Sequence, residues 1–255
     1  MPRGSRKKRI ARSNRMLISY ERGIEAATFT SYKRLAKQVR SNPNAVRRIE
    51  KQVETWRKND LEVILRRWGL RAALSHGELL FSSPGVKSVG GLEQKSFRDV
   101  FRKSIQAWTA ENALRRSKTI AEGLIGKIRK RLVSAQSEGL GEAATARSLG
   151  DLIQSRSAAA RIARTEAHTA AERGSHEAAQ SLGIDMVKEW GATEGGRTRP
   201  THARADGQIK ELDEKFDVGA DKLLHPGDPN GSAKEIINCR CVSLHHPRIN
   251  GEIIR

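Results

Sequence analysis

Hydrophobic residues recur every three or four positions over most of the chain, and this period predicts α-helices. The pattern is weak over Leu17–Val39 and strong over Ala45–Leu80, where it predicts one long helix or two with a bend. Asn42-Pro43-Asn44 separates the two stretches, because proline cannot continue a helix. Four further helices are expected over Phe97–Trp108, Ile120–Leu132, Glu142–Ile153 and Ser157–Ser181.

The pattern changes after Leu182-Gly183, where the glycine suits the end of a helix. Asp185–Trp190 and Cys239–Leu244 are predicted strands, and Asp206-Gly207 is a dipeptide typical of tight turns. The expected fold class is therefore α+β. A mainly helical, basic N-terminal part is followed by a small α+β C-terminal module with one long helix and few strands.

The positive charge of the chain is concentrated in its first 150 residues. They hold 33 Lys and Arg against 13 Asp and Glu, a balance of +20, whereas residues 151–255 hold 15 against 16. Two parts with such different charge are expected to be separate domains with different partners. We predict a basic arm over residues 1–15, a helical basic domain over 16–150 and the α+β module over 151–255.

A basic surface favours a polyanionic partner, since each phosphate that Lys or Arg neutralises releases condensed counterions. The alternative is a set of solvated helix faces that happen to be basic. No signature of a helix-turn-helix, zinc finger or β-ribbon for reading bases is present in the sequence. The residues predicted to contact nucleic acid are Arg3, Arg6, Lys7, Lys8, Arg9, Arg12, Lys127, Arg129, Lys130 and Arg131.

Several classes of protein are disfavoured by the composition. The chain has no run of 18 or more apolar residues, so no membrane span is expected. Its N-terminus, MPRGSRKKRIARSNR, lacks the apolar segment of a secretory signal. Two cysteines in 255 residues do not form a disulfide framework, and a reducing compartment is the expected environment.

Two cysteines and two histidines near the C-terminus are candidate metal ligands. On a strand, the Cα atoms of Cys239 and Cys241 would lie roughly 6.5–7 Å apart, too far for an undistorted disulfide. Two thiols on one face could instead bind zinc, with at least one of His202 and His225 completing the site. Alternatively, the cysteines are small buried hydrophobic residues, and the histidines form hydrogen bonds under the turns.

Glu166 lies on the same predicted helix face as Ile162 and Thr169. A carboxylate on a packed face has to be paired. We therefore predict a structural ion pair between Glu166 and either Arg199 or Arg240. A catalytic carboxylate is the alternative, because ion pairs and active sites both perturb carboxyl groups.

Several motifs occur together in the last third of the chain. They are RIARTEAHTAAERG (161–174), Trp190, RTRPTH (197–202), DG (206–207), HPGDP (225–229) and INCRC (237–241). In this order and spacing they resemble the phage head-morphogenesis, or minor head protein, family of the Mu F-like type. The resemblance covers Arg161 to about Val242.

The resemblance implies a structural component of a tailed phage or prophage, not an enzyme. Such a minor head protein is present inside the virion head in few copies, after passing through the host cytoplasm during assembly. It acts in head assembly and in the handling of packaged double-stranded DNA. The implied partners are the portal protein, capsid or scaffold proteins and that DNA, with no membrane. The N-terminal part of the family varies, so little is implied for residues 1–150.

Two other functions compete with this one. The first is a metal-dependent nuclease acting on phage or host DNA, in which His202, Asp206 and His225 hold the ion. Such a site calls for a carboxylate-rich cluster and a general base, yet Asp206 is the only acidic residue in RTRPTHARADG. The second is a free DNA-binding protein of the cytosol.

Overall fold

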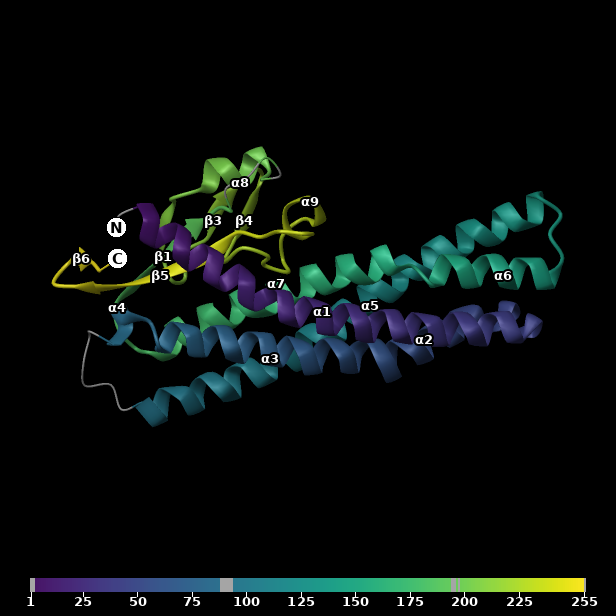
Figure 1. Cartoon of the computed structure of the whole chain (residues 1–255), viewed down its shortest axis with the longest axis horizontal. Helices are drawn as coiled ribbons and strands as arrows, with labels where there is room; N and C mark the ends of the chain where they lie inside the picture. The colour runs from purple at the N-terminus through teal and green to yellow at the C-terminus, as the bar shows by residue number, and fades with distance from the viewer. Residues whose placement is uncertain (1–2, 88–93, 194–195, 197, 255) are drawn as a thin grey trace. The chain divides into compact units, whose positions relative to one another are not determined.

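The computed structural model describes residues 3–87, 94–193, 196 and 198–254. The helices are α1 (Arg3–Ser41), the 3-10 helix η1 (Pro43–Arg48), α2 (Ile49–Trp56), the π-turn η2 (Arg57–Leu61), α3 (Glu62–Phe81), α4 (Pro84–Lys87), α5 (Gln94–Ser137), α6 (Glu142–Ile153), α7 (Arg156–Ser181), α8 (Pro200–Ala205) and α9 (Ala233–Ile236) (Figure 1). The strands are β1 (Met186–Gly191), β2 (Ile209–Glu211), β3 (Phe216–Val218), β4 (Asp221–Leu223), β5 (Val242–Ile249) and β6 (Glu252–Ile253). The predicted α+β class is confirmed. Within the described ranges, no helix is long and apolar enough to cross a membrane.

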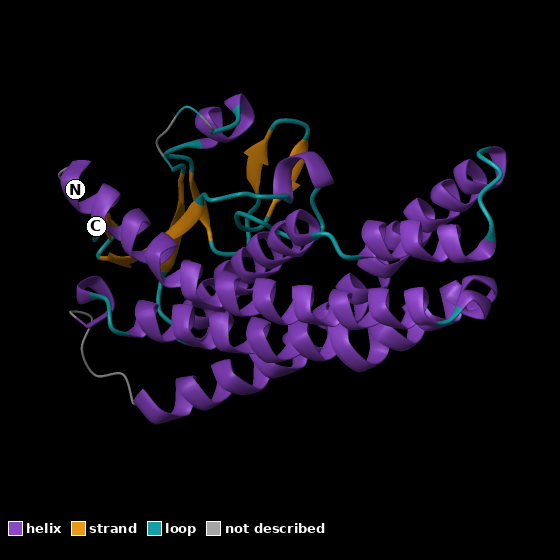
Figure 2. Ribbon diagram, turned by 45° about the vertical axis from the view of Figure 1, so that its right-hand side comes forward, coloured by secondary structure: helices purple, strands orange, loops and turns teal. Residues whose placement is uncertain are grey.

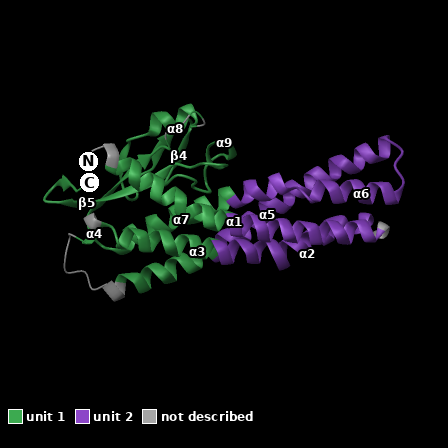
Figure 3. Ribbon diagram, viewed as in Figure 1, with its two compact units in different colours: residues 1–21, 69–109, 164–255 green, residues 22–68, 110–163 purple. Residues whose placement is uncertain are grey.

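The chain forms two compact units whose segments alternate in sequence (Figure 3). Unit 1 contains residues 1–21, 69–109 and 164–255, and unit 2 contains residues 22–68 and 110–163. These units do not follow the predicted limits at 15/16 and 150/151. Their segments alternate because α1, α3, α5 and α7 each contribute residues to both units.

Unit 2 consists of helices packed through regular apolar stripes. The predicted helical stretch Ala45–Leu80 is confirmed as η1, α2, η2 and α3 in succession. Arg57 lies at the π-turn and is buried, with hydrogen bonds to Glu54 at 2.7 and 2.8 Å and to Glu62 at 2.8 Å. A π-turn contains one extra residue, which changes the direction of the side chains that follow it. Such a turn can accommodate a buried charged side chain such as that of Arg57.

Two expected helices are a single helix in the structure. The segments Phe97–Trp108 and Ile120–Leu132 both belong to α5, which has 44 residues. The intervening sequence, TAENALRRSKT, contains strong helix formers and neither glycine nor proline. The separation was therefore wrong. The buried face of α5 continues through Thr109, Ala113 and Ser117, whose small or polar side chains do not extend the apolar pattern.

The predicted basic arm is also helical where it is described. Residues 3–15 are the first turns of α1, and Ile10 of this segment is buried against Val242 and Leu244 of β5. A helix that buries an apolar side chain is no longer a free tail. The N-terminal segment is thus part of unit 1.

The core of unit 1 contains a four-stranded antiparallel sheet in the order β2-β1-β5-β6. All six residues of β1 are buried, and β1 pairs with β5 from Met186↔Pro247 to Gly191↔Val242. A second, two-stranded sheet pairs β3 with β4. The predicted strand Asp185–Trp190 is confirmed to within one residue.

Helix α7 packs against both α3 and the strands within unit 1 (Figure 2). Glu172 accepts a hydrogen bond from the Ser243 backbone N–H of β5 at 2.7 Å. At Gly174, an added Cβ would lie 2.1 Å from the carbonyl oxygen of Ala73 in α3. This close approach requires glycine. Helix α7 is therefore held against α3 by this close approach and joined to β5 by the Glu172 hydrogen bond.

Candidate metal centre

His202, Cys239 and Cys241 converge at one buried point of unit 1. His202 lies on α8, and the two cysteines lie in the segment that leads into β5. The His202 Nδ1 atom is 3.3 Å from Cys241 Sγ and 3.6 Å from Cys239 Sγ. The three potential ligand atoms all lie within 4.8 Å of one another, and each residue is at most 3% exposed. We call this set the thiol–histidine cluster.

A turn places the two cysteines. The predicted strand Cys239–Leu244 begins only at Val242, so the expected geometry of two thiols on a strand face was wrong. Asn238 has a left-handed backbone conformation with φ 58°, and the Cys239 N–H donates to the Ile236 carbonyl at 3.3 Å. Asparagine adopts this conformation more readily than most residues. Both cysteines are free thiols.

The second nitrogen of His202 is held by a carboxylate. Its Nε2 lies 3.1 Å from Glu235 Oε2, and Thr201 Oγ1 donates to the same oxygen at 2.8 Å. The Trp190 ring meets the imidazole edge to face, with ring centroids 5.5 Å apart. These contacts restrain the orientation of the ring and leave Nδ1 directed at the thiols.

The pKa values of the two thiols are shifted in opposite directions. Hydrogen bonding with the Cys239 thiol, followed by a contact with His202, lowers the pKa of Cys241 despite its burial. The same hydrogen bond, together with burial, raises the pKa of Cys239. Cys241 is therefore the residue that loses its proton first, and the thiolate is the form that binds metals.

A pocket of about 540 Å³ opens beside the cluster. The cluster residues line it together with three arginines, Arg164, Arg199 and Arg240. Arg164 donates to Asn238 Oδ1 at 3.0 Å, and Arg199 donates to the Ile237 carbonyl. We call it the arginine-lined pocket.

The fourth predicted ligand, His225, is not part of this cluster. Its ring lies 6.0 Å from that of His176, and its Nδ1 is 3.0 Å from the Pro226 carbonyl. In the described residues, His202, Cys239 and Cys241 are the group found with metal-ligand spacing. The structure therefore brings His202, but not His225, to the cysteines. At Gly227 (φ 70°) the HPGDP segment approaches α7 so closely that an added Cβ would lie 2.5 Å from the His168 ring.

The predicted nuclease arrangement is not assembled either. Asp206 accepts hydrogen bonds from the Ala192 N–H at 2.7 Å and from Arg6 at 2.6 Å. It therefore serves as a structural acceptor, apart from both His202 and His225. No group of metal-ligand spacing within the described ranges includes Asp206.

The predicted ion pair of Glu166 stays a prediction. Glu166 is buried, as expected for a packed carboxylate. Arg240, however, forms a bidentate ion pair with Glu21 of α1, in which Arg240 Nη2 lies 2.8 Å from Glu21 Oε2. Sequence reasoning missed Glu21 because it lies 219 positions from Arg240.

Two residues of the predicted nucleic-acid set are bound within unit 1. Arg6 donates to Glu189 at 2.6 Å and Arg9 donates to the His245 carbonyl at 3.0 Å. Burial would raise the pKa of Glu189, but hydrogen bonds from His246 and Arg6 lower it to about 2. The paired carboxylate is therefore fully ionised at neutral pH, and these two arginines stabilise the fold.

Most of the other residues of the predicted set are exposed, namely Lys7, Lys8, Arg12, Lys127, Arg129 and Lys130. Arg129 pairs with Glu50 at 2.7 Å and Arg131 pairs with Glu138 at 2.7 Å. The side chain of Arg3 lies outside the described residues. Whether any of these residues binds nucleic acid stays a prediction.

Unit 1 also contains buried titratable groups that the sequence did not reveal. Burial lowers the pKa of His168 to about 3 and that of His225 to about 4. Burial raises the pKa of Glu172 to about 8 and lowers that of Lys188 to about 8. The long-range packing of α7 and β1 creates these environments, so no local motif could have indicated them.

Comparison with known proteins agrees with the motifs. Residues 126–244 match the family described as Phage Mu protein F like protein.

These residues are a Mu F-like region.

The resemblance predicted from Arg161 to about Val242 is thereby confirmed, and the Mu F-like region begins 35 residues earlier, within α5. The chain is 33% identical over 136 residues to the Minor head protein GP7 of Bacillus phage SPP1, covering 51% of this chain and 42% of that protein. These findings support a phage head protein.

A second relative carries a different name. The chain is 38% identical over 89 residues to the NAD(+)--arginine ADP-ribosyltransferase EFV of Enterococcus faecalis (strain ATCC 700802 / V583). This match covers 34% of the chain and 18% of that protein. The chain thus spans less than half the length of either of these curated relatives. No solved structure matches it.

Proposed function

We propose that this chain is a minor protein of a phage head, carried inside the virion after assembly in the host cytoplasm. The observation that carries the proposal is the Mu F-like region, together with the identity to a minor head protein over half of the chain. Within the head, the chain associates with the portal, meets capsid or scaffold proteins and contacts the packaged double-stranded DNA. Its role is structural.

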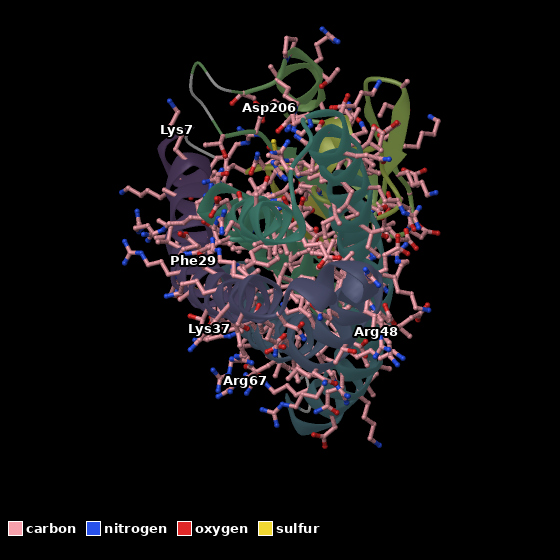
Figure 4. All side chains as sticks on the ribbon, turned by 90° about the vertical axis from the view of Figure 1, so that its right-hand side faces the viewer. Lys7, Phe29, Lys37, Arg48, Arg67 and Asp206 are labelled. Carbon is pink, nitrogen blue, oxygen red and sulfur yellow. The ribbon has the colours of Figure 1, made fainter. Side chains whose placement is uncertain are left out.

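The charge of unit 2 supports contact with DNA. This unit holds 22 Lys and Arg against 10 Asp and Glu, a balance of +12. Lys37, Arg48 and Arg67 extend from the ribbon into solvent (Figure 4). Other exposed basic residues of the unit include Lys33, Lys51, Lys118, Lys127 and Lys130. Such a surface binds phosphates without reading bases.

Neither enzymatic alternative has comparable support. The predicted nuclease ligands Asp206 and His225 lie apart from the thiol–histidine cluster, as their separate hydrogen bonds indicate. We carry no transferase activity over from the ADP-ribosyltransferase relative, because the shared segment is only 18% of that protein. Activity is argued from a site and not from a partial resemblance.

The proposal is tested by quantitative mass spectrometry of purified virions of the phage that encodes the chain. We expect the chain in a few copies per virion, and we expect it to co-purify with the portal from heads that contain no DNA. The same count after DNA release serves as the internal comparison. A chain that is absent from virions and stays free in the lysate would contradict the proposal.

A further inference from the structure

We propose that the thiol–histidine cluster binds one Zn²⁺ ion through His202 Nδ1, Cys239 Sγ and Cys241 Sγ, and that a solvent oxygen from the arginine-lined pocket completes the coordination. This inference concerns the chemistry of unit 1 alone. It does not depend on the proposed location in a phage head.

The distances within the cluster fit a tetrahedral zinc site. With Zn–S bonds of about 2.3 Å and Zn–N bonds of about 2.0–2.1 Å, tetrahedral angles place the nitrogen and each sulfur roughly 3.5–3.6 Å apart. The observed Nδ1–Sγ distances are 3.3 Å to Cys241 and 3.6 Å to Cys239. A small contraction or expansion of the cluster therefore suffices to enclose an ion.

The tautomer of His202 fits the same role. Because Nε2 lies 3.1 Å from the Glu235 carboxylate, the neutral ring carries its proton on Nε2 and donates it to Glu235. The lone pair of Nδ1 then points at the two thiols. A metal-binding histidine that donates its other N–H to a carboxylate is the common arrangement in zinc proteins. Thr201 restrains Glu235 through a 2.8 Å hydrogen bond.

A simple hydrogen-bonded cluster explains these features less completely. An unprotonated Nδ1 can accept one thiol proton, yet two sulfurs approach it at similar distances. Zinc would release both thiol protons to solvent and bind the two thiolate sulfurs and the nitrogen together. The charge of the Zn²⁺ ion would then be balanced by the two thiolates. The net charge of the site would be zero, which suits its burial.

Three protein ligands leave a fourth position, and the pocket indicates what fills it. His225 is held elsewhere by its contacts with Pro226 and His176. The arginine-lined pocket borders all three ligands, so solvent has access to the ion from that side. The ion would join α8 to the turn before β5, two segments separated by about 37 positions.

The direct test is elemental analysis of the full chain, purified without chelators and dialysed. We expect one zinc per chain, lost in His202→Ala, Cys239→Ser and Cys241→Ser and kept in His225→Ala. The last variant removes a buried histidine that is not a ligand and serves as the matched control. Glu235→Gln should weaken zinc binding by about 10–100-fold without abolishing it.

Cobalt provides an independent readout of the ligands. Co²⁺ added to the metal-free chain should give thiolate charge-transfer bands and the visible spectrum of a tetrahedral ion, both absent from Cys239→Ser. Equimolar Zn²⁺ should also protect both thiols of the native chain from a thiol reagent, which needs no variant to fold. The proposal is overturned if the chain reconstituted with zinc holds no stoichiometric metal, or if thiol reactivity is unchanged by zinc. It is also overturned if the Cys239→Ser/Cys241→Ser variant retains the ion.

Discussion

The two units of the protein use charged residues in opposite ways. Unit 2 keeps most of its charge at the surface, in exposed pairs such as Arg129–Glu50 or on single lysines such as Lys130. Unit 1 buries titratable groups, including Glu172 and Lys188, and contains both cysteines and all seven histidines of the chain. A surface of the first kind suits a polyanion, whereas buried groups of the second kind suit a specific site. The proposed contact with DNA and the proposed zinc site therefore fall in different units.

The largest expected difference between the units is their response to acid. The folded-state pKa values of His168, His176, His225 and His245 are all lowered by burial, to about 3 for His168 and about 4 for His225. Such histidines add stability above their unfolded pKa of about 6.5, and this stability is lost as the pH falls below that value. At pH 5 the loss is on the order of 2 kcal/mol for each of His168 and His225. Glu172 acts in the opposite sense. Its raised pKa of about 8 lowers stability as the pH rises from 4.5 to 8.

Hydrogen exchange measured on the full chain at pH 7 and pH 5 checks this prediction. We expect unit 1 to lose protection at pH 5, after correction for the intrinsic exchange rate, while unit 2, which contains no histidine, keeps it. Equal losses in both units would show that the buried histidines do not determine the acid response.

The next effect in size comes from the close approach of α7 and α3. Gly174→Ala places a Cβ 2.1 Å from the Ala73 carbonyl oxygen, and we expect a loss of about 2–3 kcal/mol in the free energy of unfolding. The control is Gly123→Ala in unit 2, where nothing lies within 4 Å and alanine should add about 0.5–1 kcal/mol. Denaturant titration of both variants measures the difference. Similar values would mean that the helices can move apart at little cost.

A smaller effect separates a partly buried ion pair from an exposed one. In unit 1, Glu21 and Arg240 are 13% and 31% exposed, and we expect Glu21→Gln to reduce stability by about 1 kcal/mol. In unit 2, Glu50 and Arg129 are 50% and 65% exposed, and Glu50→Gln should change stability by less than the error of a denaturant titration. A larger loss for Glu50→Gln would reverse the comparison.

Local periodicity predicted one unit better than the other. The helix Glu142–Ile153 matches α6 at both ends, because its apolar stripe and the preceding glycine are local signals. The start of β5 was missed, since Asn238 in a left-handed conformation keeps the cysteines out of the strand. Three of the four proposed metal ligands converge, but the position of His225 depends on how the HPGDP turn packs on α7. Such long-range contacts leave no trace in sequence spacing.

We propose that unit 2 provides the surface that contacts DNA, and the salt dependence of DNA binding tests this most directly. The affinity of the full chain for duplex DNA is measured over a range of salt concentrations for the native chain, for Lys127→Gln/Lys130→Gln in unit 2 and for Lys215→Gln/Lys234→Gln in unit 1. All four lysines are exposed. Each double variant removes two positive charges, so the two variants differ only in the unit that loses them. We expect the unit 2 variant to reduce the magnitude of the slope of log affinity against log salt by up to about 2, and the unit 1 variant to leave the slope unchanged. Equal slopes for the two variants, or no binding of the native chain at low salt, would contradict it.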